Sequence, residues 1–328
     1  MIFPLIFSQI LSRYPSFLRS TNSFVGFYTT SITIVLASDV NIKNSMFLLI
    51  TGSSVLQSSQ ELNISITYST FFNCSSTDSI IKLHATKNLC FRYCCVCDCS
   101  SLKSNFIEKS GIDGYTDTLF LNNFYHSSRG YIGTDLILLI HGYMHISNIN
   151  ISKCSTNGVT CFNLDNFQDS SFLNYVTITH SMSSSIFMEF DSKIIIDSMN
   201  FCHCSSSGSS ESIAHFIFTA ESLIRNCVFQ NISGSIKLIK ANSLQVIQCY
   251  SDLLESSIGV SGFTASTTIE TLDIMHYDHW LCAVDNTYYP RPTPFQTLPT
   301  PCGYTKFNPR KNLFIKVVSL PFLVCYNN

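Results

Sequence analysis

The densest group of residues able to do chemistry in this chain is a run of closely spaced cysteines. They lie in the segment CFRYCCVCDC, at Cys90, Cys94, Cys95, Cys97 and Cys99. Thiolates this close together can bind Zn²⁺ or Cu⁺, and pairs of them can form disulfides. The segment also alternates as a β-strand does, and successive side chains of a strand point to opposite faces. Such a strand does not bring four thiolates to one ion, so buried thiols packed in a core are the third interpretation.

A second group gathers two histidines, an aspartate and the only tryptophan in the segment HYDHW. His276, Asp278 and His279 are residue types that ligate metals, and Trp280 could stack on a sugar ring. The alternative is a polar and aromatic cap that covers the exposed edge of a last strand. We favour the cap, because nothing else in the sequence points to a metal or a sugar at this position.

Four aspartates are the remaining acids with a spacing of interest, at Asp165, Asp169, Asp191 and Asp197. Hydrolysis of a glycosidic bond needs two carboxyl groups about 5 to 10 Å apart. Asp165 and Asp191 meet this requirement only if the fold stacks them. The sequence lacks the Asn-Thr-Asp, Asp-Asp and Gly-His-Gly elements of carbohydrate-cleaving enzymes. The sequence therefore assigns no catalytic, cofactor-binding or metal-binding residue. Whether any of these groups come together depends on the elements that position them.

Those elements repeat along the chain. A short phrase, a small residue followed by serine, as in FFNCSS, returns in altered form at intervals of 23 to 28 residues. The repeated positions are Cys74, Cys99, His126, Cys154, Ser181, Cys204 and Ile232. A regular interval of this length is the sign of a solenoid, in which each repeat packs against the next.

The residues before each repeated position alternate in polarity. Three and five residues earlier the side chain is apolar in six of the seven repeats, whereas four residues earlier it is mostly polar. This alternation is typical of a half-buried strand. A serine-rich turn and a second apolar run follow, as in Ile80–Leu83, so each repeat holds two or three strands.

This pattern predicts an all-β fold, a right-handed parallel β-helix with a coil of about 26 residues and an irregular C-terminal tail. Leucine-rich, helical and propeller repeats need a dense leucine scaffold, a 3.6-residue period or about 40 to 45 residues, and none of these is present. In a β-helix, equivalent residues stack about 4.8 Å apart. The small residue would then fill an inner corner, and the serines outside would cap the turn with their hydroxyls.

With the repeats in register, residues 45–255 resemble the Cys- and Ser-rich right-handed β-helix surface proteins of parasitic protists, which are distantly similar to bacterial polymorphic outer-membrane proteins. A recurring Phe-x-Asn supports the resemblance, at Phe71/Asn73, Phe120/Asn122, Phe172/Asn174 and Phe229/Asn231. The tract PRPTPFQTLPTP, Pro290 to Pro301, resembles the stalks of such proteins. The resemblance implies adhesion or display at a host surface, and it implies no particular chemistry.

We expect the following organisation along the chain. A leader or N-terminal cap takes up 1–30, the β-helix 31–255, a C-terminal cap 256–289, a Pro/Thr-rich linker 290–301 and an unassigned tail 302–328.

Composition excludes some partners and leaves others open. Only 12% of the residues are charged and the formal net charge is −2, so no basic surface for nucleic acid is expected. No apolar segment reaches the roughly 18 to 20 residues of a membrane-spanning helix. Four Asn-x-Ser sequons permit glycosylation in a secretory setting. They lie at Asn63, Asn73, Asn150 and Asn231.

We therefore predict a non-enzymatic structural or adhesin-like protein, extracellular or at the cell surface, that binds a host or surface protein or a glycan. No cofactor is expected. The alternative is a carbohydrate-active enzyme, a polysaccharide lyase or a glycoside hydrolase, built on the same fold.

Overall fold

The computed structural model describes most of the chain between Ser23 and Ala265, together with Leu272. The described residues are 23–34, 39–102, 105–125, 135–156, 161–184, 186–207, 212–216, 221–234, 237–241, 243–253, 255–265 and 272. Contacts divide the chain into a unit of Met1–Tyr277 and a unit of Asp278–Asn328, and every described residue lies in the first.

The largest sheet, sheet A, takes one or two strands from each coil. Its strands are β1 (Ser23–Tyr28), β3 (Val40–Leu48), β6 (Ile64–Thr67), β7 (Thr70–Phe72), β10 (Leu89–Arg92), β11 (Cys95–Cys97), β14 (Thr116–Tyr125), β15 (Ile137–Ser152), β18 (Phe172–Thr179), β21 (Ile195–Cys202), β24 (Ser222–Arg225), β25 (Val228–Gln230), β27 (Leu244–Ile247), β28 (Cys249–Ser251) and β29 (Phe263–Ala265).

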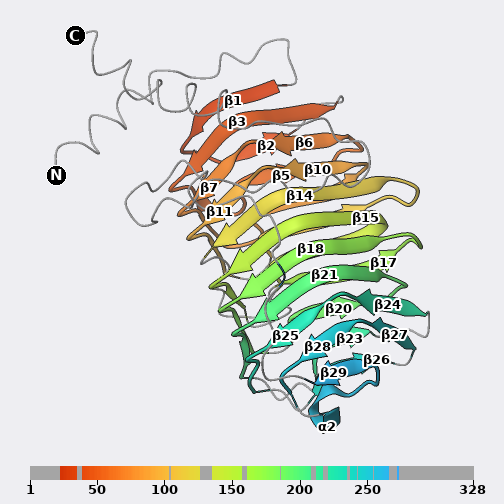
Figure 1. Ribbon diagram of the computed structural model, residues 1–328. Coiled ribbons are helices and arrows are strands. Elements are labelled where there is room, and N and C mark those ends of the chain that lie inside the picture. The colour runs from red at the N-terminus through yellow and green to blue at the C-terminus, as the bar shows by residue number, and fades with distance from the viewer. Residues whose placement is uncertain are drawn as a thin grey trace, which may run out of the picture. The chain divides into compact units, whose positions relative to one another are not determined.

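A second sheet, sheet B, packs its inner side against that of sheet A. Its strands are β2 (Ile32–Ile34), β5 (Leu56–Ser58), β9 (Ile81–Thr86), β13 (Ile107–Gly111), the first part of β15, β17 (Phe162–Phe167), β20 (Met188–Phe190), β23 (Ser212–Phe216) and β26 (Lys237–Ala241). Two-residue strands form a short third side: β4 (Thr51–Gly52), β8 (Ser75–Ser76), β12 (Ser100–Ser101), β16 (Ser155–Thr156), β19 (Met182–Ser183) and β22 (Ser205–Ser206). The short helix α2 (Glu255–Ile258) lies at the end of the stack where β29 lies (Figure 1).

All strand pairings between described residues are parallel, and each strand pairs with its equivalent in the next coil. Figure 1 shows these strands one above another from β1 to β29. The coils are about 25 residues long, which confirms the predicted parallel β-helix. Among the described residues, strand pairing runs from Ser23 to Ala265, so residues 23–28 and 263–265, which fall within the predicted caps, pair as part of the solenoid.

The predicted register is wrong by one residue in a single coil. Val96 pairs with Phe124, and Phe124 pairs with Ile151, so Phe124 is the inward residue that the sequence register assigned to Asn123. Phe124 is fully buried, and the extra residue in this coil lets its large apolar ring reach the core. The predicted position His126 lies outside the described residues.

Left-handed backbone at fixed places turns each coil. One column of such residues lies in the middle of sheet A, at φ between 50° and 58°. It consists of Asn44, Tyr68, Tyr93, Leu121, Asn148, Tyr175, Ser198, Asn226 and Gln248. Asparagine adopts this conformation readily, but for tyrosine or leucine it costs about 1 kcal/mol or more. The hydrogen bonds between neighbouring coils on both sides of each bend must offset that cost.

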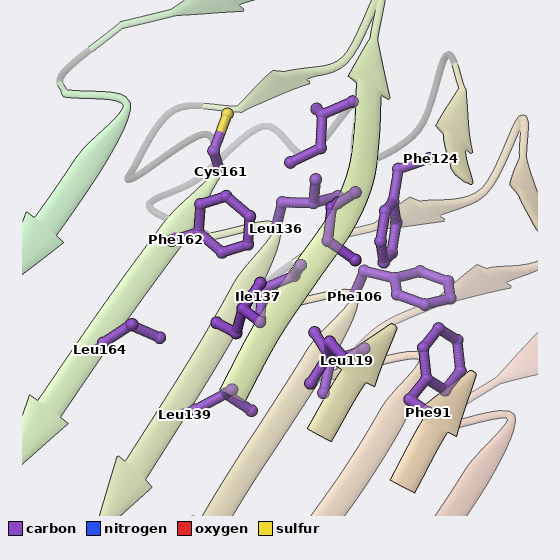
Figure 2. Close-up of a cluster of buried hydrophobic side chains, with 14 of the residues drawn as sticks. Phe91, Phe106, Leu119, Phe124, Leu136, Ile137, Leu139, Cys161, Phe162 and Leu164 are labelled. Atoms are coloured by element: carbon purple, nitrogen blue, oxygen red, sulfur yellow. The ribbon is translucent and has the colours of Figure 1, made fainter. Parts of the chain in front are cut away.

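Phenylalanine fills much of the interior. Phe47 and Phe71 stack with ring centroids 4.5 Å apart, and Phe106 of the sheet B side meets Phe71 and Phe124 edge to face, at 5.7 Å in each case. Figure 2 shows rings from the two sheets meeting in this way, among them Phe91, Phe106 and Phe124. Such pairs add to the stabilisation that comes from burying apolar area alone.

The sequence predicts that the serines after the repeated position lie outside, but only some of them do. Ser75 and Ser100 are half-exposed, but Ser76 and Ser101 point inward and are buried. The hydroxyls of Ser76 and Ser101 donate to the carbonyl oxygen of Asp78, at 2.6 and 2.7 Å. A strand of two residues places successive side chains on opposite faces, and the buried hydroxyl satisfies a carbonyl of the tight turn.

Candidate functional site

The dense cysteine run divides between two faces of the β-helix, as a strand requires. Cys94 and Cys99 point into the core, and Cys90 is half-buried on the outer face of sheet A. Cys95 is disulfide-bonded. Burial raises the pKa of Cys97 to about 12, so this thiol stays protonated at neutral pH. These cysteines do not converge, and among the described residues no group of three or more His, Cys, Asp or Glu side chains is arranged to hold a metal.

The described repeated positions lie at the corner between sheet A and the third side, where Cys74 stacks with Cys99, and Cys154 with Ser181, Cys204 and Ile232. In each case the residue just after a repeated position donates its backbone N–H to the carbonyl of the repeated position in the preceding coil. Ser100 donates to Cys74 in this way, and Met182 donates to Cys154. Cys74, Cys99, Cys154, Ser181 and Cys204 are buried. Ile232, in a later coil, is only half-buried. The column has room for a slim side chain because the chain turns there.

One pocket of the described surface lies on the outer face of sheet A, where β3, β6 and β10 begin. It is shallow, with a volume of about 470 Å³. Four of its lining residues, Asp39, Asn41, Asn63 and Asn88, carry carboxylate or amide groups, and the rest of the lining is Val40, Ile64, Ser65 and Cys90. Asn63 is also a sequon and Cys90 belongs to the dense cysteine run, but neither pattern predicts a pocket. The one usable signal was an asparagine at the same place in successive coils, Asn63 and Asn88.

A hydrogen-bonded chain of side chains forms one wall of this pocket. The amide of Asn63 donates to Asp39 Oδ2 at 2.9 Å, and the amide of Asn88 donates to Asn63 Oδ1 at 2.6 Å. Asn88 Oδ1 accepts the backbone N–H of Thr116 at 2.7 Å. The Asn63 hydrogen bonds lower the pKa of Asp39, so this carboxylate is charged at neutral pH. The wall is therefore ordered and carries one negative charge.

Aromatic and basic side chains lie farther along the same strands. The half-buried rings of Tyr68 and Tyr93 stack with centroids 4.6 Å apart and only 2° between their planes. The Arg92 guanidinium lies 6.0 Å from the centroid of the Phe120 ring. Hydroxyl, amide, aromatic and guanidinium groups on one flat face can bind sugars or polar segments of another protein.

A carboxyl pair lies on the outer face of sheet B. Asp191 follows β20, and its backbone N–H donates to the carbonyl of Leu164, so it stacks beside Asp165 in the preceding coil. The two side chains are hydrogen-bonded to each other, and burial together with this bond raises the pKa of Asp191 to about 6. Glu189 is on the same face, and burial and the neighbouring acids Asp135 and Asp191 raise its pKa. Sequence spacing predicted only that Asp165 and Asp191 could stack.

The four sequons differ in environment. The amide nitrogens of Asn63 and Asn150 donate to Asp39 and to Asn123, and that of Asn231 lies 2.7 Å from His203 Nδ1. Asn73 is exposed at a left-handed corner next to Cys74. Asn73 and Asn231 are the exposed acceptors of the four, and of these two Asn231 lies against His203.

Several predicted features fall outside the described residues. They are the HYDHW cluster, the Pro/Thr-rich tract and the tail. Over the part of the chain that is described, no helix is long and apolar enough to cross a bilayer. No protein-family model, no curated protein and no solved structure matches this chain.

Proposed function

We propose that this chain is a non-enzymatic, adhesin-like β-helix protein that binds a glycan or a protein along the outer face of sheet A. The observation that carries the proposal is the shallow pocket, with its ordered asparagine wall and the stacked tyrosines beside it. Display or secretion is part of the proposal and rests on the resemblance to Cys- and Ser-rich surface proteins.

The geometry favours recognition over chemistry. A parallel β-helix is a rigid scaffold, because each strand is hydrogen-bonded to the coils on both sides, and binding to a rigid face orders few side chains. One wall of the pocket carries the carboxylate of Asp39 and the amides of Asn63 and Asn88 at the spacing of the coils. An extended partner with regularly spaced polar groups, such as a polysaccharide, matches that spacing.

Blocking the pocket floor should abolish binding. Ser65 is half-exposed between Asn41 and Cys90 in adjacent strands, so Ser65→Trp would fill the pocket from its floor. We expect this variant to lose at least tenfold in affinity for the best ligand of a glycan array and a panel of surface proteins. Ser147→Trp, on the same face but several coils away, should bind as the wild type does. Equal affinity in both variants, or no ligand at all, would contradict the proposal.

The second candidate is a carbohydrate-active enzyme, favoured by the pairing of Asp165 and Asp191. Hydrogen-bonded carboxyl groups are, however, closer than the roughly 5 Å of retaining glycosidases and much closer than the spacing of inverting ones. The pocket also lies over sheet A, whereas the acids lie over sheet B. These two facts place the enzyme second.

Incubation with neutral and uronic-acid polysaccharides separates the two functions. For a binding protein we expect no reducing ends and no unsaturated products above background, with the wild type equal to an Asp165→Asn/Asp191→Asn variant. Product release that the double variant abolishes would establish the enzyme and refute the binding function as the primary one.

A further inference from the structure

We propose that Cys74–Cys99 and Cys227–Cys249 are two sites of disulfide formation, each of which joins neighbouring coils of the β-helix. The oxidant is a small-molecule disulfide such as oxidised glutathione. The inference concerns covalent modification of the core, and it stands apart from the function proposed for the outer face of sheet A.

The first pair lies at the repeated corner position of two successive coils. The backbone N–H of Ser100 donates to the carbonyl of Cys74 at 2.9 Å, which fixes Cys74 and Cys99 as in-register neighbours. In-register parallel neighbours have Cα atoms about 4.8 Å apart, within the 4.4 to 6.8 Å range of disulfides. The two thiols are hydrogen-bonded to each other. Neither cysteine is disulfide-bonded in this structure, and the register places them in adjacent coils.

The second pair repeats this arrangement at another column. Tyr250 pairs with Val228, and the backbone N–H of Tyr250 donates to the carbonyl of Cys227 at 2.9 Å, so Cys227 and Cys249 are also in register. Both are fully buried, and their thiols are hydrogen-bonded to each other. The two pairs lie in different coils and different columns. Each of them therefore tests independently whether cysteines stacked in adjacent coils form a disulfide.

Other thiols of the described core have no cysteine at the neighbouring position. Cys94 is flanked by Ser69 in the preceding coil and Asn122 in the next. Cys154 is followed by Ser181, whose hydroxyl accepts the backbone N–H of Cys154 at 3.2 Å. Cys204 is two coils from Cys154, near 10 Å, which no disulfide spans without movement. Stacking thus selects the two pairs from a chain of 15 cysteines.

The reaction is two steps of thiol–disulfide exchange. The Cys74 thiolate attacks one sulfur of oxidised glutathione, forms a mixed disulfide and releases one glutathione thiolate. The Cys99 thiolate then attacks the Cys74 sulfur and releases the second glutathione, so two protein thiols are oxidised and one glutathione disulfide is reduced. In the folded protein the hydrogen bond from Cys99 lowers the pKa of Cys74, and burial raises that of Cys99. Because both thiols are buried, exchange takes place during folding or local opening.

The test uses the full chain, both as purified without reductant and after refolding in a buffer of reduced and oxidised glutathione. Thiols are alkylated under denaturant, and the protein is digested with trypsin without reduction. Lys82, Lys87 and Arg92 separate Cys74 from Cys99, and Lys237 and Lys240 separate Cys227 from Cys249. We expect mass spectrometry to find each pair as two joined peptides.

Matched variants assign the bond. Trypsin leaves Cys94, Cys95, Cys97 and Cys99 on one peptide, and Cys95 is itself disulfide-bonded. The link between this peptide and the Cys74 peptide should therefore vanish in Cys99→Ser and persist in Cys94→Ser, Cys95→Ser and Cys97→Ser. The oxidised protein should also unfold at a higher urea concentration than the reduced protein, and Cys99→Ser/Cys249→Ser should remove that difference. Alkylation of Cys74 and Cys249 in the refolded protein overturns the proposal. A Cys74 link that survives in Cys99→Ser overturns it equally.

Discussion

Lys109→Met should lower the free energy of unfolding by about 3 to 5 kcal/mol, because it leaves a buried carboxylate without its partner. Lys109 Nζ lies 2.7 Å from Asp117 Oδ2, and both side chains are completely buried. The same ammonium donates to the carbonyl of Lys87 at 3.2 Å, and Asp117 Oδ1 accepts the backbone N–H of Leu89 at 2.9 Å. Urea unfolding followed by circular dichroism measures the loss.

The double variant separates the value of the pair from the cost of breaking it. Lys109→Met/Asp117→Val replaces both charges with apolar groups, and we expect it to regain most of the stability lost in Lys109→Met. Gly111 shows how closely the lysine is packed, because a Cβ at that position would lie 2.2 Å from Lys109 Nζ. If the single and double variants were equally unstable, lost packing of the lysine stem would be the cause, and not the uncompensated charge.

The same pair gives stability a pH dependence. Burial raises the pKa of Asp117 from an ordinary value of 3.8 to about 6, although Lys109 favours the carboxylate. The folded protein then holds this proton more tightly than the unfolded chain does. Its contribution to stability is complete below about pH 4 and is lost as the pH rises through about 6. The difference in unfolding free energy between wild type and Asp117→Asn should fall over that interval, and a difference that rose would contradict the assignment.

Phe71→Ala should destabilise the protein by about 3 to 5 kcal/mol, through lost burial and the cavity that remains. Phe71 is fully buried, stacks on Phe47, and meets the edge of Phe106 from sheet B. Its removal therefore weakens the contact with sheet B of the next coil, through Phe106, and the contact with the coil before, through Phe47. Urea unfolding of the variant measures the cost.

Phe172→Ala is the matched control. Phe172 lies on the outer face of sheet A, is half-buried and stacks on His145 with centroids 4.6 Å apart. We expect a cost of about 1 kcal/mol, the value of one exposed aromatic contact. Similar losses in Phe71→Ala and Phe172→Ala would mean that the inward and outward faces of sheet A are exchanged.

The sequence by itself determined the coil and its two faces. Phe71, Ile151, Phe201 and Phe229 repeat at the coil length and alternate with polar residues, and a strand that buries one face needs that alternation. The coil with Phe124 was misread because its extra residue shifts the apolar positions, and sequence spacing alone does not say which neighbour turns inward. The stacking of Cys74 on Cys99 followed from the same register.

Only the tertiary structure decided which exceptional residues meet. Lys109 interrupts an inward column between Leu83 and Leu139, where strand alternation predicts an apolar residue. Its partner Asp117 lies on the other sheet, so their contact depends on how the two sheets face each other. The pocket on sheet A and the Cys227–Cys249 pair likewise form only when adjacent coils stack. Alternation along a strand is a local property that the chain carries everywhere, whereas a pairing between coils or sheets exists only after the coils close and stack.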